Sequence, residues 1–201
     1  MQPDPYPYRH VILGLWVAWA LYWFVSALGA KTTVRRETLR SRSVYVVLGI
    51  IGGLLIGWPG RAAGWLAERL WPRSPTSWWI GVALLCAGLA FAVWARVVLG
   101  RNWSGSVTVK EGHELIRSGP YGYVRHPIYT GLITALLGTA VTIGMVRTFL
   151  GVALIIAAFL RKMRTEERFM RETFPDEYQR YSAEVPALVP FMSPRRPPAQ
   201  R

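Results

Sequence analysis

The sequence is poor in cysteine, lysine and acidic residues, and each shortage excludes a class of protein. The single cysteine, Cys86, lies in an apolar run, so no intrachain disulfide can form and no metal site is spelled out. Only three of the 24 basic residues are lysine, and 11 acidic residues leave a net charge of +13. The basic residues lie between apolar runs, without the interleaved stacking aromatics of a nucleic-acid face. We therefore expect no nucleic acid as a partner.

The N-terminal residues lack the features of a cleaved signal peptide. Residues 1–10 are rich in proline and tyrosine and have neither a basic start nor a small-residue cleavage site. We therefore expect the apolar run that follows them to be retained as a membrane span.

Apolar residues are abundant and gather in runs that suit a bilayer. They make up 52% of the 201 residues, and a helix needs about 18 to 20 of them in a row to cross. Five candidate spans follow, at residues 11–30, 44–58, 78–99, 128–145 and 148–160. The second and fifth are short, and helix continuing to residue 172 completes the fifth. The sequence predicts an all-α, polytopic membrane protein with about five transmembrane helices.

The distribution of Lys and Arg predicts the orientation of these helices. The connections 31–42 and 96–125 carry five basic residues each and the region after residue 160 carries nine, against five on the opposite side. This asymmetry places the N-terminus outside and the C-terminus in the cytoplasm. We expect an integral protein of a prokaryotic inner membrane, with its functional site facing the cytoplasm.

The chain divides into three segments by composition. Residues 1–96 hold the first spans, and within them residues 60–71 are expected to form an amphipathic helix on the outer interface, with Trp65 and Trp71 toward lipid and Arg69 toward water. Residues 97–191 hold the polar motifs and are expected to form the functional core. Residues 192–201, rich in proline, are expected to be disordered.

A polar cluster stands at the start of the fourth apolar run, in residues 118–131. Such a cluster at the edge of a bilayer is costly unless it binds something. Pro127 disfavours helix at His126 and suits the first helical position, so the fourth helix should begin there. Its free N–H groups, with Arg125 beside them, are fit for a carboxylate or phosphate. Alternatively, Arg125 and His126 only snorkel and Tyr129 belongs to an aromatic belt.

An acidic pair, Glu166 and Glu167, follows the fifth apolar run. One hypothesis is a solvated helix face, in which Glu167 pairs with Arg171 at i,i+4 and Arg164 at i,i+3. The other is that one carboxylate turns inward to hold a hydroxyl or ammonium of a ligand bound by the first cluster.

A short helix is expected after this pair. Asp176 should cap it, it should end before Pro186, and it could fold back as a lid.

The motifs together resemble a known family. Residues 115–131, L-I-R-S-G-P-Y-G-Y-V-R-H-P-I-Y-T-G, are followed by R-T-E-E at 164–167, F-P-D-E-Y-Q-R-Y at 174–181 and V-P at 185–186. With G-R-N-W-S at 100–104, this pattern resembles the isoprenylcysteine carboxyl methyltransferase family and, less closely, phospholipid N-methyltransferases. The resemblance covers about residues 97–191. It departs at Pro175, where family members often have glycine.

The resemblance implies an integral membrane methyltransferase that uses S-adenosylmethionine, with no metal, and takes a lipophilic or prenylated substrate sideways from the membrane lipids. It implies catalytic roles for Arg125 and Glu167. The residues implied in the cofactor pocket are Gly119, Pro120, Tyr121, Tyr123, His126, Pro127, Tyr129, Gly131 and Glu166. Four kinds of methyl acceptor suit such a pocket: a prenylated cysteine carboxylate, a thiol, an amine-bearing phospholipid and another lipophilic acid.

Two other functions stay open. Membrane sterol reductases, which bind NADPH, have a similar Arg-His-x-x-Tyr-x-Gly stretch, but Gly-Pro-Tyr, the Glu-Glu pair and the short chain favour the methyltransferase. A non-catalytic scaffold or transporter subunit predicts polar residues near the bilayer midplane. The spans contain few, Ser26 and Cys86 among them. Methyl transfer from a sulfonium needs alignment and exclusion of water, which agrees with the lack of a Ser/His/Asp constellation.

Overall fold

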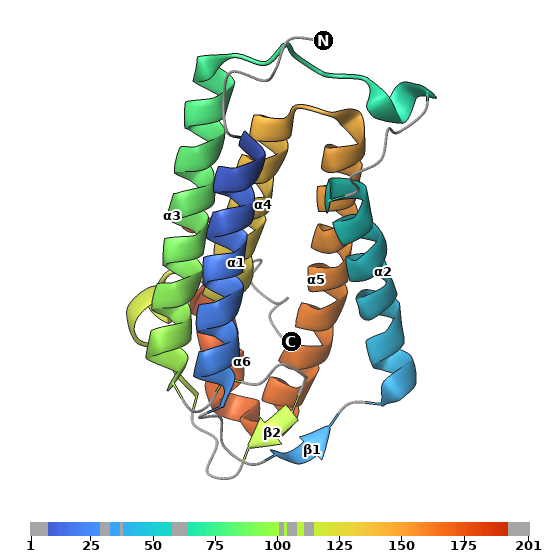
Figure 1. Cartoon of the computed structure of the whole chain (residues 1–201). Helices are drawn as coiled ribbons and strands as arrows, with labels where there is room; N and C mark the ends of the chain where they lie inside the picture. Colours follow the sequence, from blue (N-terminus) through green and yellow to red (C-terminus); the bar gives the residue numbers. More distant parts are fainter. Residues whose placement is uncertain are drawn as a thin grey trace.

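The computed structural model of the protein describes residues 8–28, 33–36, 38–57, 64–100, 103, 108–110 and 115–192. Within these residues, five long helices run alternately in opposite directions (Figure 1). They are α1 Tyr8–Ala27, α2 Leu39–Gly57, α3 Pro75–Leu99, α4 Pro127–Ile143 and α5 Val146–Thr173. The shorter elements are β1 Thr33–Arg36, η1 Gly64–Ala67, β2 Thr108–Lys110, η3 Gly119–Gly122 and α6 Pro175–Glu184. The predicted helical architecture is confirmed, with one small addition.

The addition is a two-stranded antiparallel sheet. β1 pairs with β2, Thr33 opposite Lys110 and Arg36 opposite Thr108. It ties the α1–α2 connection to the α3–α4 connection at the end of the helices where α6 also lies (Figure 1). Apart from residue 192, the tail expected to be disordered lies outside the described residues. The division at residues 96 and 97 stays a prediction.

Helix boundaries follow local chemistry. α3 starts with a capping box in which Ser74 and Ser77 exchange side-chain to backbone hydrogen bonds, and Pro75 takes the first turn. α4 begins at Pro127, as predicted. Its C-cap residue is Gly144, whose φ of 67° lies in the left-handed region that glycine adopts without strain. Only two residues separate α4 from α5, so the two helices form a tight hairpin.

Glycines let α3 and α4 pack with their backbones in close approach. A Cβ atom on Gly131 of α4 would lie 2.5 Å from the carbonyl oxygen of Gly88 on α3, and one on Gly138 would lie 2.5 Å from that of Gly81. Small residues at such spacing are the usual means of association for helices in lipid.

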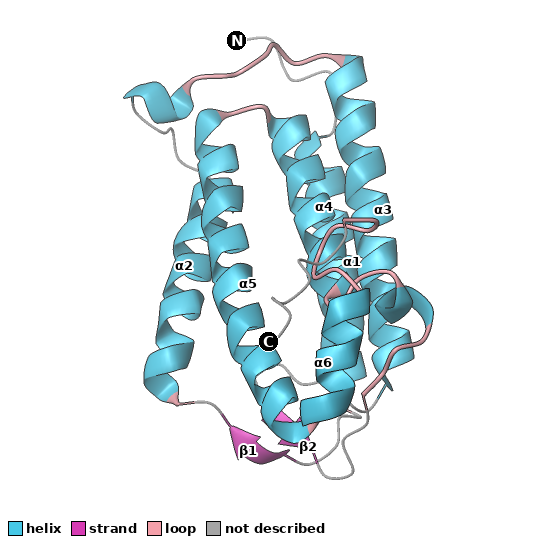
Figure 2. Ribbon diagram, turned by 180° about the vertical axis from the view of Figure 1, so that it is seen from behind, coloured by secondary structure: helices cyan, strands magenta, loops and turns pink. Residues whose placement is uncertain are grey.

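α2 and α5 form a second close pair. A Cβ atom on Gly52 would lie 2.6 Å from the carbonyl oxygen of Gly151. Figure 2 shows the two pairs, α3 with α4 and α2 with α5, side by side, with α6 at the lower end of the bundle.

Two apolar clusters hold the helices together, and the second of them joins the two pairs. The first lies between α3 and α4 with α1 packed on it, and contains Leu85, Leu89, Ala92, Leu132 and Ala135. The second joins α4 to α5 and contains Leu136, Ala140 and Val152. α1 is further fixed by Trp16, whose Nε1 donates to Thr139 Oγ1 of α4 at 3.0 Å.

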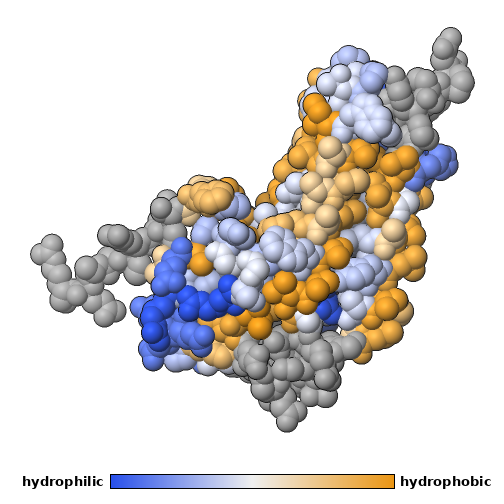
Figure 3. All heavy atoms as spheres, turned by 90° about the vertical axis from the view of Figure 1, so that its left-hand side faces the viewer, coloured by the Kyte–Doolittle hydropathy of each residue, from blue (hydrophilic) through white to orange (hydrophobic). Residues whose placement is uncertain are grey.

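The outer surface of the helices is strongly apolar. In Figure 3, apolar residues cover the shaft of the molecule on the face shown, and hydrophilic residues gather toward its lower left. Phe24 on α1 is 68% exposed. Among the described residues, Arg9–Ala27 and Pro75–Leu99 are each long and apolar enough to cross a membrane, with mean hydropathies of 1.6 and 2.2. Ser41–Gly57 and Pro127–Ile143 are apolar but shorter.

Two local expectations are wrong. Of residues 60–71, those from 64 on are described, and their only helical part is one turn of 3-10 helix, η1, rather than an amphipathic α-helix. Arg69 does not simply face water, because its Nη2 donates to the carbonyl of Ile143 at the end of α4, 2.7 Å away. That carbonyl has no partner within its own helix, so the arginine satisfies it.

Phe174, not Asp176, is the N-cap residue of α6; Asp176 lies in the first turn.

Candidate functional site

The site lies where the segment before α4 meets the chain that follows α6. The backbone N–H groups of Arg125 and His126 donate to the carbonyls of Pro186 and Ala187, at 2.8 and 3.0 Å. In the first turn of α4, Thr130 Oγ1 donates to the carbonyl of Leu188 at 2.7 Å. These contacts hold residues 185–188 against the start of α4, and they fix the backbone from which Arg125 and His126 project.

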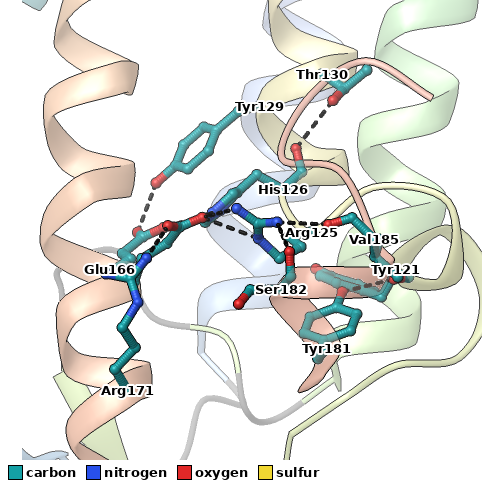
Figure 4. Close-up of polar contacts among 11 residues, drawn as sticks. Tyr121, Arg125, His126, Tyr129, Thr130, Glu166, Arg171, Tyr181, Ser182 and Val185 are labelled. Atoms are coloured by element: carbon teal, nitrogen blue, oxygen red, sulfur yellow. Dashed lines mark hydrogen bonds and ion pairs between the residues drawn. The ribbon is translucent and has the colours of Figure 1, made fainter. Parts of the chain in front are cut away.

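Arg125 connects α5 to α6. Its Nε and Nη2 donate to Glu167 Oε1 at 3.1 and 2.7 Å. Its Nη1 donates to the carbonyls of Ser182 and Val185 at 3.0 and 2.6 Å. Figure 4 shows the guanidinium between the carboxylates of α5 and the end of α6. At least one N–H on every guanidinium nitrogen is therefore engaged by the protein itself.

His126 lies between the two carboxylates. Its Nε2 is 3.2 Å from Glu167 Oε1, and its Nδ1 is 3.6 Å from Glu166 Oε2. Its ring stacks on that of Tyr129, with centroids 5.7 Å apart. Tyr129 in turn donates its hydroxyl to Glu166 Oε1 at 2.7 Å, and Figure 4 shows this side chain reaching from α4 toward α5.

The two glutamates are buried to different extents. Glu167 is 13% exposed and also accepts from Arg171 Nη2 at 2.9 Å, the i,i+4 pair expected from the sequence. Glu166 is 25% exposed. Both carboxylates face the cluster, so the hypothesis of a solvated helix face is wrong. The two arginines of that hypothesis, Arg164 and Arg171, are exposed.

The electrostatics of the cluster favour an ionised Glu167. Burial by itself raises the pKa of this carboxyl, but hydrogen bonds from His126 and Arg125, with the charges of both side chains, outweigh burial and lower the pKa to about 2. Glu167 is therefore ionised at neutral pH, in a state suited to accepting hydrogen bonds from Arg125 and His126.

α6 is docked on the loop that contains η3. Tyr181 donates its hydroxyl to the carbonyl of Tyr121 at 2.7 Å, and Arg117 pairs with Glu184 at 2.9 Å. Burial raises the pKa of Tyr181 to about 12, although the charges of Arg125 and Arg117 oppose the rise. Tyr181 therefore stays a neutral donor, and α6 is held beside the cluster. A role of α6 as a lid stays a prediction.

The structure brings five of the predicted site residues into direct contact. They are Arg125, His126, Tyr129, Glu166 and Glu167.

The other predicted residues shape the surroundings. Pro120, Tyr121 and Pro127 are buried. Gly119 has a φ of 58°, a left-handed conformation that glycine adopts without strain. Gly131 lies against Gly88 and Ala92 of α3, and its place in a cofactor pocket stays a prediction.

Tyr123 lies away from this buried group, because its side chain is 54% exposed. Its place in a cofactor pocket stays a prediction.

Two residues beside the cluster were missed by the sequence analysis. Lys162 Nζ lies 3.8 Å from Glu166 Oε1, and the same ammonium lies 5.9 Å from the ring centroid of Tyr45 on α2. The i,i+4 spacing of Lys162 and Glu166 was a signal that could have found the lysine. No comparable signal marks Tyr45, which is one aromatic residue within an apolar run.

Comparison with known proteins gives two kinds of match. A model of the isoprenylcysteine carboxyl methyltransferase family matches residues 80–172. A protein-S-isoprenylcysteine O-methyltransferase of Schizosaccharomyces pombe is 33% identical over 114 residues, which cover 55% of this chain and 48% of the relative. A cobalt-zinc-cadmium resistance protein of Cupriavidus metallidurans is 31% identical over 121 residues, covering 57% and 53%. The chain thus matches about half the length of these curated relatives.

A solved structure shows the same fold. The eukaryotic intramembrane Ras methyltransferase, an isoprenylcysteine carboxyl methyltransferase, superposes with a TM-score of 0.54. The match covers 93% of this chain and 68% of that one at 20% identity. The likeness supports a helical membrane fold for this chain.

Proposed function

We propose that this chain is an integral membrane methyltransferase of the isoprenylcysteine carboxyl methyltransferase family, whose model matches residues 80–172. In this proposal it transfers a methyl group from S-adenosylmethionine to a lipophilic acceptor. The family match favours this activity over the reductase and scaffold alternatives.

One observation carries the proposal: the first polar cluster and the acidic pair meet in a single site. Tyr129 donates to Glu166 at 2.7 Å, and Arg125 pairs with Glu167 at 2.7 Å. Both contacts join the segment 118–131 to α5, and these are the two regions that carry the family's motifs. The side chains of the segment 118–131 and of α5 are therefore close enough to act on one ligand.

The residues fit a sulfonium cofactor by their chemistry. S-adenosylmethionine supplies a methyl group made electrophilic by a positively charged sulfur. The partly exposed carboxylate of Glu166 offers an opposite charge, and the stacked rings of His126 and Tyr129 offer aromatic faces that attract cations. We propose that these three residues line the cofactor pocket.

The remaining residues of the cluster would position these three. Arg125 and Glu167 hold one another and the end of α6, and they fix the His126 ring through Glu167 Oε1. We propose that this arrangement aligns the reactants and excludes water, which is most of what an in-line methyl transfer requires. A carboxylate or thiolate acceptor needs no base, because it attacks as an anion. Arg125 and Glu167 thus act on the reaction through other residues.

We also propose that five helices cross the membrane, with the N-terminus outside and the site facing the cytoplasm. The alternating directions of α1 to α5 are consistent with five crossings (Figure 1). The basic residues gather on the side that carries α6 and the polar cluster. Cytoplasmic adenosylmethionine could then reach the site, while the acceptor enters from the bilayer. A prokaryotic inner membrane is the location that we propose.

Titration calorimetry on the solubilised protein tests the proposed cofactor. We expect saturable binding of S-adenosylmethionine and no binding of NADPH. Glu166→Gln should weaken adenosylmethionine binding by about tenfold, because it removes the charge that faces the sulfonium. Glu177→Gln removes an exposed carboxylate on α6 and should leave binding unchanged. Saturable NADPH binding without adenosylmethionine binding would establish the reductase instead.

A double-mutant cycle tests whether Tyr129 and Glu166 act together. Tyr129→Phe removes the hydroxyl that holds Glu166 at 2.7 Å. If the pair acts as one unit, the loss of affinity in the double variant will be smaller than the sum of the single losses. Strict additivity would show that Tyr129 is only a wall of the site.

A further inference from the structure

The chain that follows α6 leads into a turn of exposed apolar residues. The backbone N–H of Met192 donates to the carbonyl of Val189 at 3.5 Å, which closes a turn with the sequence Val-Pro-Phe-Met. The side chains of Val189, Phe191 and Met192 are 53%, 93% and 63% exposed. Three large apolar side chains therefore project from four consecutive residues, and residues 189–192 are called the apolar turn below.

Phe191 occupies a position at which the backbone favours glycine. Its φ is 65°, the only positive value at a non-glycine residue in the part of the chain that the structure describes. With Pro190 before it, the turn has the pattern of a type II turn, whose third residue needs a positive φ and is usually glycine or asparagine. A bulky residue is strained there. Because the ring is almost fully exposed, the protein supplies little packing to offset this strain, and a contact outside the chain would offset it.

Backbone contacts hold the apolar turn beside the first turn of α4. Directly before it, the carbonyl of Leu188 accepts from Thr130 Oγ1 at 2.7 Å, and the carbonyl of Ala187 accepts from the N–H of His126 at 3.0 Å. Figure 2 shows the loop after α6 extending past that helix, along α4, toward the middle of the bundle. In the proposed orientation, this loop therefore lies on the membrane side of α6.

The first turn of α4 lies near the boundary between the hydrocarbon and the cytoplasm. Tyr129 in this turn contacts Glu166 on α5, six residues after the apolar run of α5 ends at Leu160. Six helical residues rise about 9 Å, which is close to the depth of the head-group layer on one side of a bilayer. Apolar side chains at this boundary insert about 5 to 10 Å and anchor the segment that carries them.

We propose that the apolar turn inserts between the lipid head groups and acyl chains on the cytoplasmic side, and that it thereby anchors residues 185–188 and α6 beside the start of α4. The inference rests on the proposed membrane orientation and not on the methyl transfer. The occupant is lipid, because the shaft of the bundle beside the turn also presents an apolar outer surface (Figure 3).

Insertion would act on the polar cluster through the backbone that precedes the turn. Arg125 Nη1 donates to the carbonyl of Val185 at 2.6 Å, and the N–H of Arg125 donates to the carbonyl of Pro186 at 2.8 Å. Lipid would hold the far end of the segment whose near end these contacts hold. Without this anchor, residues 185–188 and α6 would open more often, and the contacts of Arg125 would open with them.

A nitroxide label measures the depth of the apolar turn in phospholipid vesicles. One label is attached to Cys86, which is exposed on α3. In chains with Cys86→Ser, others are attached through Met192→Cys or through Gln179→Cys, at an exposed position of α6. Oxygen concentrates in hydrocarbon and a nickel chelate stays in water, so the ratio of their collision rates with the label reports depth. We expect the ratio at position 192 to exceed that at position 179 by about threefold or more, toward the value at position 86. Equal ratios at positions 192 and 179 would overturn the proposal.

Phe191→Gly separates an anchor from an ordinary turn. Glycine relieves the strain of the positive φ, so a turn with no contact outside the chain should become more stable, whereas an anchor loses its largest side chain. In vesicles, we expect proteolysis within residues 174–185 to be about threefold or more faster in Phe191→Gly than in the wild type. Phe191→Trp keeps an aromatic side chain suited to the interface and should match the wild type.

Phe24→Ala is the matched control, because it removes an exposed aromatic side chain from α1, away from α6, and should leave the proteolysis rate unchanged. If Phe191→Gly is cleaved at the wild-type rate or more slowly, the apolar turn does not anchor α6 and the inference is wrong.

Both measurements need neither cofactor nor acceptor, so they separate this inference from the proposed function. A wild type that neither binds adenosylmethionine nor methylates any acceptor contradicts the proposed activity, and the label at position 192 still decides the inference. A label on Cys86 that meets the nickel chelate as often as the label at position 179 would contradict the membrane orientation, and the inference with it.

Discussion

Arg125 and Glu167 are 42 positions apart in the chain, and Nη2 of the arginine lies 2.7 Å from Oε1 of the glutamate. The remaining contacts of the guanidinium go to backbone carbonyls of Ser182 and Val185. One side chain thus joins the segment before α4, the extension of α5 and the end of α6. The sequence suggested that Arg125 grips an anion of the ligand; these contacts favour a role in holding α6 over the site.

Replacing Arg125 by lysine should loosen α6. Lysine keeps the charge but cannot reach Glu167 and both carbonyls together, because it lacks the planar fork. We expect a loss of stability of roughly 1.5 to 3 kcal/mol, the usual value for hydrogen bonds of a charged group, with faster proteolysis within residues 174–185. The melting temperature and the cleavage sites are the measurements. Arg171→Lys, at a side chain that is 56% exposed, is the matched control. Unchanged protection of α6 would show that the arginine does not hold it.

The stability of the protein should depend on pH through Glu167. The cluster lowers the pKa of this carboxyl from its ordinary 4.5 to about 2. A lowered pKa means that the stabilising contribution is complete above about pH 4.5 and is lost as the pH falls toward 2. The contribution is on the order of 3 kcal/mol. Melting temperatures between pH 6 and about pH 3 should show the loss, and Glu167→Gln should flatten the curve. If the melting temperature of the variant depends on pH as strongly as that of the wild type, a group other than Glu167 causes the pH dependence.

Adjacent glycines of α2 should respond oppositely to alanine. A Cβ atom on Gly52 would lie 2.6 Å from the carbonyl oxygen of Gly151, whereas nothing lies within 4 Å of one on Gly53. Gly52→Ala should force α2 and α5 apart at a cost of about 1 to 3 kcal/mol. Gly53→Ala should be neutral or stabilising by up to about 1 kcal/mol, through helix propensity. Melting temperatures of the two variants check this, and equal values would contradict the close packing of the two helices.

The proposed orientation can be checked with reporters fused to the two ends of the chain. If five helices cross the membrane, a reporter that works only in the cytoplasm should be active when fused after residue 201. A reporter that works only outside should be active when fused before residue 1. Moving basic residues from the C-terminal side to the opposite side should weaken this preference. Activity of both fusions on the same side would mean an even number of crossings.

Features that depend on one or two turns of chain could be predicted from the sequence. α4 begins at Pro127 because the proline ring disfavours helix at the residue before it, and that rule is local. Apolar runs likewise indicated the long helices, and the resemblance in residues 97–191 indicated the family. Where the local signal was weaker the prediction failed: Phe174 took the N-cap position expected for Asp176, and the segment before α3 formed a single 3-10 turn.

Only the tertiary structure decided which side chains meet. From the sequence, Glu166 and Glu167 could face solvent or the site, because the sequence of one helix does not show which of its faces packs against other helices. The packing of α5 against α4 turned both inward, toward Tyr129 and Arg125. The approach of α2 to α5 at Gly52 and Gly151, which brings Tyr45 near Lys162, was equally invisible. Contacts of this kind depend on how whole helices pack, and residues far apart in the chain carry no local signal of the partners that packing gives them.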